Sequence, residues 1–218
     1  MASLSNPNLT ISGSHVGVSI GQDGASQMGL EDIAMFRSIP KSIIFYPSDA
    51  VSAEKLVHLA VNIKGLKYIR ITRPKTPIIY PQTENFSLGD FKILRQSPQD
   101  KVAVIGTGIT LHEALKAHEI LKAKNILTSI IDLYCIKPLE TKRLLSFIRQ
   151  HGNKLVVVED HYKEGGIGEM LSSELANTNI QIKNLSIQQI PHCGSMEELL
   201  DRYQISSKYI VEAVKSIL

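Results

Sequence analysis

The chain has 218 residues, of which 43% are hydrophobic and 21% charged, a composition typical of globular domains. Its 24 basic and 21 acidic residues are nearly balanced and dispersed along the chain, which argues against nucleic acid as a partner. There is no apolar run near the roughly 20 residues of a membrane span and no signal-peptide pattern, and two lone cysteines fit a reducing compartment, so we expect a cytoplasmic protein without a membrane partner.

Residues 13–32 combine five glycines with short polar side chains. Glycine lets a backbone turn sharply and approach a ligand closely, so His15, Asp23 and Gln27 on such a loop can converge on one small polar molecule. An imidazole donates a hydrogen bond or a positive charge, and a carboxylate accepts hydrogen bonds from hydroxyl groups. Two of these residues also have a plain structural interpretation. His15 can be a histidine bonded to backbone, and Asp23 with Gly24 can be an ordinary turn.

A helix is expected soon after residue 30, where Glu31 and Asp32 favour its N-terminus through the helix dipole. The β-branched residues at 42–46 predict a buried strand. A second helix follows this strand, with Ser48 or Asp49 as its N-cap.

Residues 67–72 predict the next strand, and the order strand, helix, strand favours a right-handed parallel unit. Arg73 directly follows that strand. Because ligands of open parallel sheets bind beyond the carboxyl ends of the strands, Arg73 is placed to clamp a phosphate with its planar guanidinium; the plain alternative is a solvated surface charge. Together His15, Asp23 and Arg73 predict a site for the phosphate and hydroxyls of a sugar phosphate.

Residues 74–100 form a mostly irregular connection that contains three prolines before residue 82. We place the domain boundary there, with a first domain at residues 1–88 and a second at residues 89–218.

The second domain repeats the alternation of strands and helices. Strands are predicted at 91–95, 102–106, 127–132, 155–158 and 182–190, and helices at 110–123, 137–150, 168–176, 196–200 and 208–218. Thr110 and Glu113 have the spacing of a capping box. The predicted fold class is α/β: a partial parallel-sheet domain followed by a three-layer α/β/α domain with a mainly parallel sheet.

Other motifs in the second domain have weaker functional interpretations. Gly106-Thr-Gly108 lacks the third small residue of a dinucleotide fingerprint, because Leu111 stands there, so a tight turn is favoured and nucleotide binding is the alternative. His161 follows two acidic residues, but neighbouring side chains on a strand point to opposite faces, so no catalytic dyad is expected. Cys135 and Cys193 have no CxxC partner, which excludes zinc and redox motifs.

Residues 13–28, with 30–32 and 35–40, closely resemble the pyrimidine-binding domain of transketolases, and residues 45–50 and 69–74 continue the resemblance. The second half resembles the C-terminal domain of the same family through 104–108, 110–114, 136–139, 158–162 and 164–169. The resemblance covers nearly the whole chain after about Asn8.

Transketolases use thiamine diphosphate and a divalent cation, Mg²⁺ or Ca²⁺, to move a two-carbon ketol unit between sugar phosphates of the pentose phosphate pathway, and they act as homodimers. The resemblance implies that His15 and Arg73 bind the substrate phosphate. It also implies that Asp23 contacts a substrate hydroxyl and that Gln27 lies beside the thiamine.

By the same resemblance, the family's catalytic glutamate and its diphosphate- and metal-binding domain belong to a segment upstream of residue 1. We therefore expect the substrate-phosphate-binding and dimerisation part of a transketolase, with no catalytic residue and no metal ligand of its own. Alone, such a chain is expected to be inactive, to bind no cofactor tightly, and to associate through its unpaired sheet edge. Its expected partners are the remaining transketolase segments or a second transketolase chain. The alternative is a non-catalytic module that pairs with a full-length transketolase.

Overall fold

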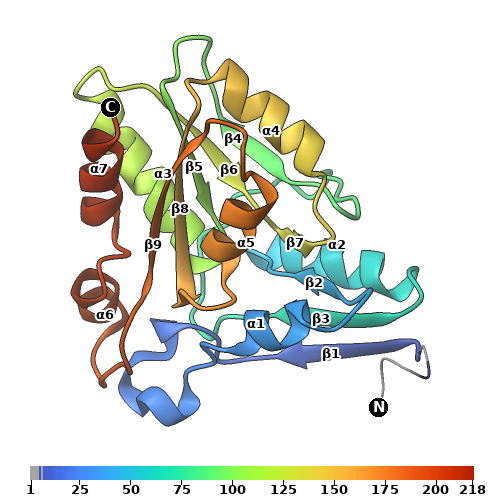
Figure 1. The fold of residues 1–218 in the computed structure, drawn as a ribbon. Coiled ribbons are helices and arrows are strands. Elements are labelled where there is room, and N and C mark those ends of the chain that lie inside the picture. The colour runs from blue at the N-terminus through green and yellow to red at the C-terminus, as the bar shows by residue number, and fades with distance from the viewer. Residues whose placement is uncertain (1–4, 6) are drawn as a thin grey trace.

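The computed structural model describes residue 5 and residues 7–218, which fold around two mainly parallel sheets (Figure 1). The first sheet has four strands in the order β1-β3-β2-β7, with β1, β3 and β2 parallel and β7 antiparallel to β2. Its strands are β1 (Leu9–Gly13), β2 (Ile43–Phe45), β3 (Leu66–Arg70) and β7 (Cys135–Lys137). The helices of this half are α1 (Asp32–Arg37) and α2 (Ala50–Val61), with the 3-10 turns η1 (Val18–Asp23) and η2 (Ala25–Gln27).

The second sheet has five strands in the order β4-β6-β5-β8-β9, all parallel except β4. Its strands are β4 (Lys92–Arg95), β5 (Val102–Gly106), β6 (Thr128–Asp132), β8 (Lys154–Tyr162) and β9 (Gln181–Ile187). Its helices are α3 (Ile109–Lys122), α4 (Thr141–Gln150), α5 (Ile167–Glu174), α6 (Met196–Arg202) and α7 (Ser207–Ser216). In Figure 1, α3 and α7 lie on one side of this sheet, and α4 and α5 lie on the other.

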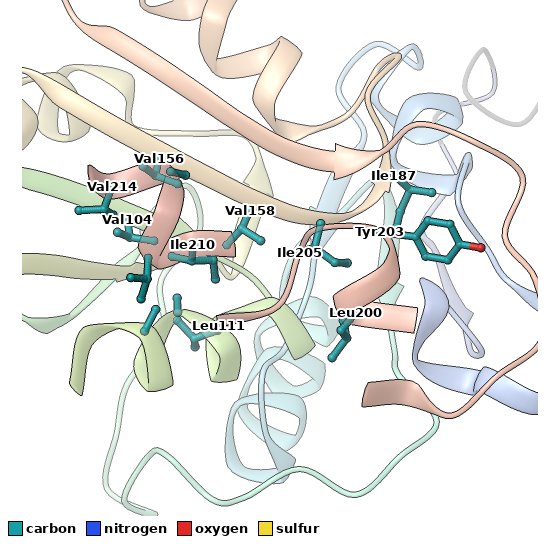
Figure 2. Close-up of a cluster of buried hydrophobic side chains, with 14 of the residues drawn as sticks. Val104, Leu111, Val156, Val158, Ile187, Leu200, Tyr203, Ile205, Ile210 and Val214 are labelled. Carbon is teal, nitrogen blue, oxygen red and sulfur yellow. The ribbon is translucent and has the colours of Figure 1, made fainter. Parts of the chain in front are cut away.

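The second half of the chain has three layers, helices on each side of the sheet, because both faces of the sheet are apolar. Successive residues of β5 enter different apolar clusters, because side chains alternate across a strand. Figure 2 shows the first of these clusters, in which Val104 and Val156 of the sheet lie close to Leu111 of α3 and Val214 of α7. The predicted α/β fold class with mainly parallel sheets is confirmed.

Strand β7 crosses the predicted domain boundary. It belongs to the second half of the chain, yet Lys137 and Cys135 pair with Ile44 and Phe45 of β2. The first sheet is therefore completed by three residues from beyond residue 88. These residues were predicted to lead directly into a helix from residue 137, which is wrong: α4 begins only at Thr141.

Local capping was predicted with mixed success. Asp49 is the N-cap of α2 and accepts a hydrogen bond from the backbone of Ser52 at 2.7 Å, as predicted. The capping box of Thr110 and Glu113 is wrong, because Gly108 is the N-cap of α3. Thr110 instead donates to the Val158 carbonyl at 2.8 Å, so a contact with the neighbouring strand replaces the local one.

Strand β1 occupies one edge of the first sheet and had not been predicted as a strand. It pairs with β3 on one side, and its residues 9–12 are all exposed. Leu9 and Ile11 retain 42% and 36% of their accessible surface. Within the described part of the chain, no helix has both the length and the apolarity to cross a membrane.

Candidate functional site

The glycine-rich loop begins where β1 and β3 end side by side. Gly13 is paired with Arg70 in the parallel register, and the Ile71 N–H donates to the Gly13 carbonyl at 2.8 Å. Val16 N–H then donates to the Ile71 carbonyl at 3.5 Å. His15 therefore lies beside the segment that carries Arg73, at the carboxyl ends of two neighbouring parallel strands, which is where ligands of such sheets bind.

Arg73 and Asp23 are brought together although 50 positions separate them. The Nη1 atom of Arg73 lies 2.8 Å from the Oδ2 atom of Asp23, and the side chains of Arg73 and Asp23 are 54% and 46% exposed. Exposed ion pairs contribute at most about 1 kcal/mol, so a ligand phosphate can compete for this guanidinium. The predicted phosphate clamp is thus reachable from solvent.

The two remaining predicted site residues lie on the same loop. His15 is half-buried with a left-handed backbone (φ 64°), and its Nδ1 lies 2.8 Å from the Ser14 hydroxyl. Gln27 ends η2 and is exposed. The side chains of this loop therefore supply an imidazole, a carboxylate and an amide, and Arg73, from the segment after β3, adds a guanidinium beside Asp23.

A buried ion network beneath this loop had not been predicted. Arg70 is fully buried, with Nε 2.8 Å from an Asp32 oxygen and Nη1 2.8 Å from an Asp160 oxygen. Its Nη2 donates to the carbonyls of Gly29 and Asp160 at 3.0 Å each. The ring of Tyr46 lies 4.5 Å from the guanidinium carbon, and its hydroxyl donates to Asp160. The network joins β3 of the first sheet to β8 of the second.

The pKa values of the two carboxylates in this network are shifted in opposite directions. Burial raises the pKa of Asp160 above its ordinary value, and the attraction of Arg70 offsets this only in part. For Asp32, burial also raises the pKa, but Arg70 and the Tyr68 hydroxyl together bring it below the ordinary value. Asp32 was predicted to favour a helix N-terminus through the helix dipole, and it does lie in the first turn of α1; its carboxylate is in addition a buried partner of Arg70 and Tyr68.

Gly17 explains how closely the loop approaches this network. Its φ is +67°, and a Cβ atom there would lie 1.8 Å from an Asp160 carboxylate oxygen. Any side chain at this position would displace Asp160 from Arg70. The glycine spacing of the loop is thus required in part by the ion network, and not only by a ligand.

The acidic pair before His161 has structural partners. Glu159 accepts from the backbone N–H groups of Ile167 and Gly168 at the start of α5 and from the Asn184 amide, while burial raises its pKa to about 7. His161 accepts from the Ala34 backbone at 3.4 Å, and burial and then Arg70 lower its pKa to about 4. Both ring nitrogens of His161 therefore have backbone partners, Ala34 and Tyr162, and not the carboxylates of Glu159 or Asp160.

The turn after β5 is likewise used within the protein. The Gly108 N–H donates to the Ser48 hydroxyl at 3.0 Å, and Thr110 bonds the Thr107 and Val158 carbonyls. The Gly108 N–H and the Thr110 hydroxyl therefore already have partners within the protein, which fits the interpretation of a tight turn.

Within residues 5 and 7–218, no group of three or more His, Cys, Asp or Glu side chains is arranged to hold a metal ion. The loop offers donors and acceptors for phosphate and hydroxyl groups.

The fold and the loop together define a class of protein: paired α/β domains that present a polar, glycine-rich loop at the carboxyl ends of a parallel sheet. The family model for the transketolase pyrimidine-binding domain matches residues 1–78, and that for the transketolase C-terminal domain matches residues 89–210. The chain belongs to the transketolase family, whose members are transferases. The resemblance found in the sequence is confirmed.

Curated relatives match along the whole chain. Transketolase-like protein 1 of Bos taurus is 50% identical over 219 residues, covering 100% of this chain and 37% of the relative. Homo sapiens transketolase is 47% identical over 219 residues, covering 100% of this chain and 35% of the relative. The chain thus spans about a third of the length of these relatives. The family implies thiamine diphosphate and a divalent metal in the full enzyme.

Two solved structures share the fold. A split-gene transketolase, described as an inactive β4 tetramer, superposes with a TM-score of 0.86 at 26% identity, covering 98% of this chain and 67% of that chain. A transketolase from Campylobacter jejuni gives a TM-score of 0.80 at 19% identity, covering 99% of this chain and 32% of that one. The second likeness shows the fold alone.

Proposed function

We propose that this chain is the substrate-phosphate-binding and dimerisation part of a thiamine-diphosphate-dependent transketolase, which transfers a two-carbon ketol unit between sugar phosphates. The observation that carries the proposal is the exposed Asp23–Arg73 pair beside His15, at the carboxyl ends of β1 and β3. The family membership of the chain supports it independently.

Each loop residue has a role in this proposal. The Arg73 guanidinium binds the substrate phosphate as a planar fork, and His15 donates a second hydrogen bond to it. Asp23 leaves Arg73 and accepts a hydrogen bond from a substrate hydroxyl. Gln27 borders the thiamine and the substrate. In the complete enzyme, thiamine diphosphate and Mg²⁺ or Ca²⁺ supply the bond-breaking chemistry; this chain alone binds neither tightly.

The partner that completes the enzyme is a polypeptide carrying the remaining transketolase segments, or a second transketolase chain. The split-gene neighbour supports this, because that chain is described as an inactive tetramer. The same description favours the alternative function, a non-catalytic module that pairs with a full-length transketolase. Two free thiols are in keeping with a cytoplasmic location.

A coupled ketol-transfer assay tests the proposal. With thiamine diphosphate and magnesium, the chain alone gives no turnover, and adding a polypeptide with the remaining segments restores it. In that complex, Arg73→Ala raises KM for the sugar phosphate by about 10- to 100-fold, since a charged hydrogen bond contributes ~1.5–3 kcal/mol. Arg95→Ala is the matched control, because Arg95 is also exposed and lies 4.0 Å from Glu119.

Three outcomes of this assay are decisive. Turnover by the chain alone contradicts the proposal, and so does an unchanged KM in the Arg73 variant. Stable binding to a full-length transketolase with no turnover in any mixture establishes the alternative.

The exposed edge at β1 gives a separate prediction. Because β1 presents unpaired backbone groups with exposed Leu9 and Ile11, the chain alone is expected to form higher oligomers. Ile11→Lys, a charge of the kind that natural edges use, shifts the population to smaller species in size-exclusion chromatography with light scattering. Val61→Lys, at a 71% exposed position on α2, leaves it unchanged. Equal effects of the two variants would rule out β1 as the contact.

A further inference from the structure

Residues 192–194, from the second half of the chain, pack directly against residues 18–24 of the glycine-rich loop. The Gly194 N–H donates to the Gly21 carbonyl at 3.4 Å. A Cβ atom on Gly24 would lie 2.7 Å from the Cys193 sulfur, so a side chain there would force the Cys193 side chain or the loop to shift. Gly24 directly follows Asp23, so this contact lies one residue from the carboxylate that meets Arg73.

The segment from His192 to Gly194 is itself fixed to the core of the second domain. The His192 N–H donates to the Tyr203 hydroxyl at 2.7 Å. Tyr203 is 5% exposed and belongs to the same apolar cluster as Val18 and Ile20 of the loop. In Figure 2 its ring lies beside Ile187, at the end of the cluster formed with Leu200 and Ile205. The segment therefore has a rigid support on one side and the loop on the other.

The loop itself has little other backbone support. Between residues 18 and 27, backbone hydrogen bonds within the described chain run from residue to residue inside the loop, except for the one from Gly194 to Gly21. Asp23 and Arg73 are both about half exposed, and such a pair is too weak to hold a loop in place. Val18 and Ile20 anchor the start of the loop in the apolar cluster, and beyond them the residues that pack against Gly21 and Gly24 fix the backbone next to Asp23.

We propose that residues 192–194 are a positioning element of the phosphate site: they hold the 18–24 loop so that Asp23 meets Arg73. The inference rests on the proposed function of that loop and extends it, because it gives the C-terminal domain a role in substrate binding. None of the three residues touches the substrate; they act through the backbone of the loop.

A double-mutant experiment tests the contact at Gly24. Gly24→Ala places a methyl group against the Cys193 sulfur, and Cys193→Ala in the same chain removes that sulfur. We expect Gly24→Ala to speed hydrogen exchange in the peptide 17–29 by about tenfold, and to weaken fructose 6-phosphate binding, followed by NMR of the His15 ring, by a similar factor. Cys193→Ala alone has a smaller effect, and the double variant lies closer to the wild type than Gly24→Ala does.

Two further variants separate the contact from general strain. Gly24 has φ +77°, so alanine is strained there whatever its neighbours; Gly65 has φ +120° with nothing within 4 Å, and Gly65→Ala measures that strain without a contact. Tyr203→Phe removes the acceptor for His192 while keeping the ring, and gives a smaller rise in exchange in the same peptide. If Gly24→Ala does not fold, the exchange measured in Tyr203→Phe tests the proposal in its place.

Different results would overturn the phosphate site and the positioning role. A wild-type chain that binds no fructose 6-phosphate overturns the phosphate site, and this inference with it. Intact binding in the wild type, with unchanged exchange in Gly24→Ala and Tyr203→Phe or no recovery in the double variant, overturns the positioning role alone.

Discussion

Replacing Arg70 with alanine is expected to cost about 3–5 kcal/mol of unfolding free energy, the range for removing one partner of a buried ion pair. Arg70 is fully buried between Asp32 and Asp160, at 2.8 Å from each. Without the guanidinium, two carboxylates stay buried without a counter-charge, and the carbonyls of Gly29 and Asp160 lose their donors. Because the network joins β3 to β8, the loss weakens the contact between the two sheets.

Arg73 provides a matched control for this experiment. It also lies 2.8 Å from an aspartate, but it is 54% exposed, so Arg73→Ala is expected to cost no more than about 1 kcal/mol. Urea unfolding followed by circular dichroism measures both variants, since the chain has no tryptophan to report by fluorescence. Equal costs for the two arginines would contradict the assignment of Arg70 as the buried link.

Strands with continuous apolar runs were predicted well, and strands defined by their neighbours were not. Residues 102–106 match β5 because buried parallel strands have a continuous apolar run. Strand β7 has only three residues, and β1 is exposed along most of its length, so neither has a periodicity to detect. Both exist because a partner strand offers hydrogen bonds, which is tertiary information.

The candidate site shows the same limit. The polar residues of the glycine-rich loop could be singled out from composition, but the pairing of Asp23 with Arg73 depends on β1 lying next to β3 in parallel. The one signal for the buried network was the presence of charged residues in mostly apolar strands, Arg70 at the end of β3 and Asp160 in β8, but Lys67 and Glu159 in the same strands gave the same signal. Which charge meets which depends on how the two sheets approach each other, and no local pattern contains that.

The loop and the buried network form one structural unit. Arg70 donates to the carbonyl of Gly29, whose N–H donates to the carbonyl of His15. Gly17 in turn lies against Asp160. The glycine-rich loop is therefore supported at its ends by the ion network and in its middle by residues 192–194, so both halves of the chain contribute to its shape.

Asp132 is a second buried carboxyl group at the contact between the two halves. It ends β6, is fully buried, and accepts hydrogen bonds from the Tyr80 hydroxyl at 2.5 Å and the Ser48 hydroxyl at 3.0 Å. Burial raises its pKa to about 7 from an ordinary value of 3.8, and the two hydroxyl donors offset only part of that effect. The folded protein therefore retains a proton on this group at pH values where the unfolded chain has lost it.

This difference predicts how stability depends on pH. A carboxyl whose folded pKa is raised contributes stability that is fully present below the unfolded pKa and is lost as pH rises through the folded pKa. Asp132→Asn removes the titration, so relative to this variant the wild type should lose about 1.4 kcal/mol per pH unit, or about 3–4 kcal/mol in all, between pH 4 and 7. Urea unfolding at four pH values measures the difference, with Glu212→Gln, at an exposed position on α7, as the control whose curve stays parallel to the wild type. A constant difference between the wild type and Asp132→Asn across this range would show that the carboxyl is ionised in both states, and that the hydroxyls of Tyr80 and Ser48 outweigh its burial.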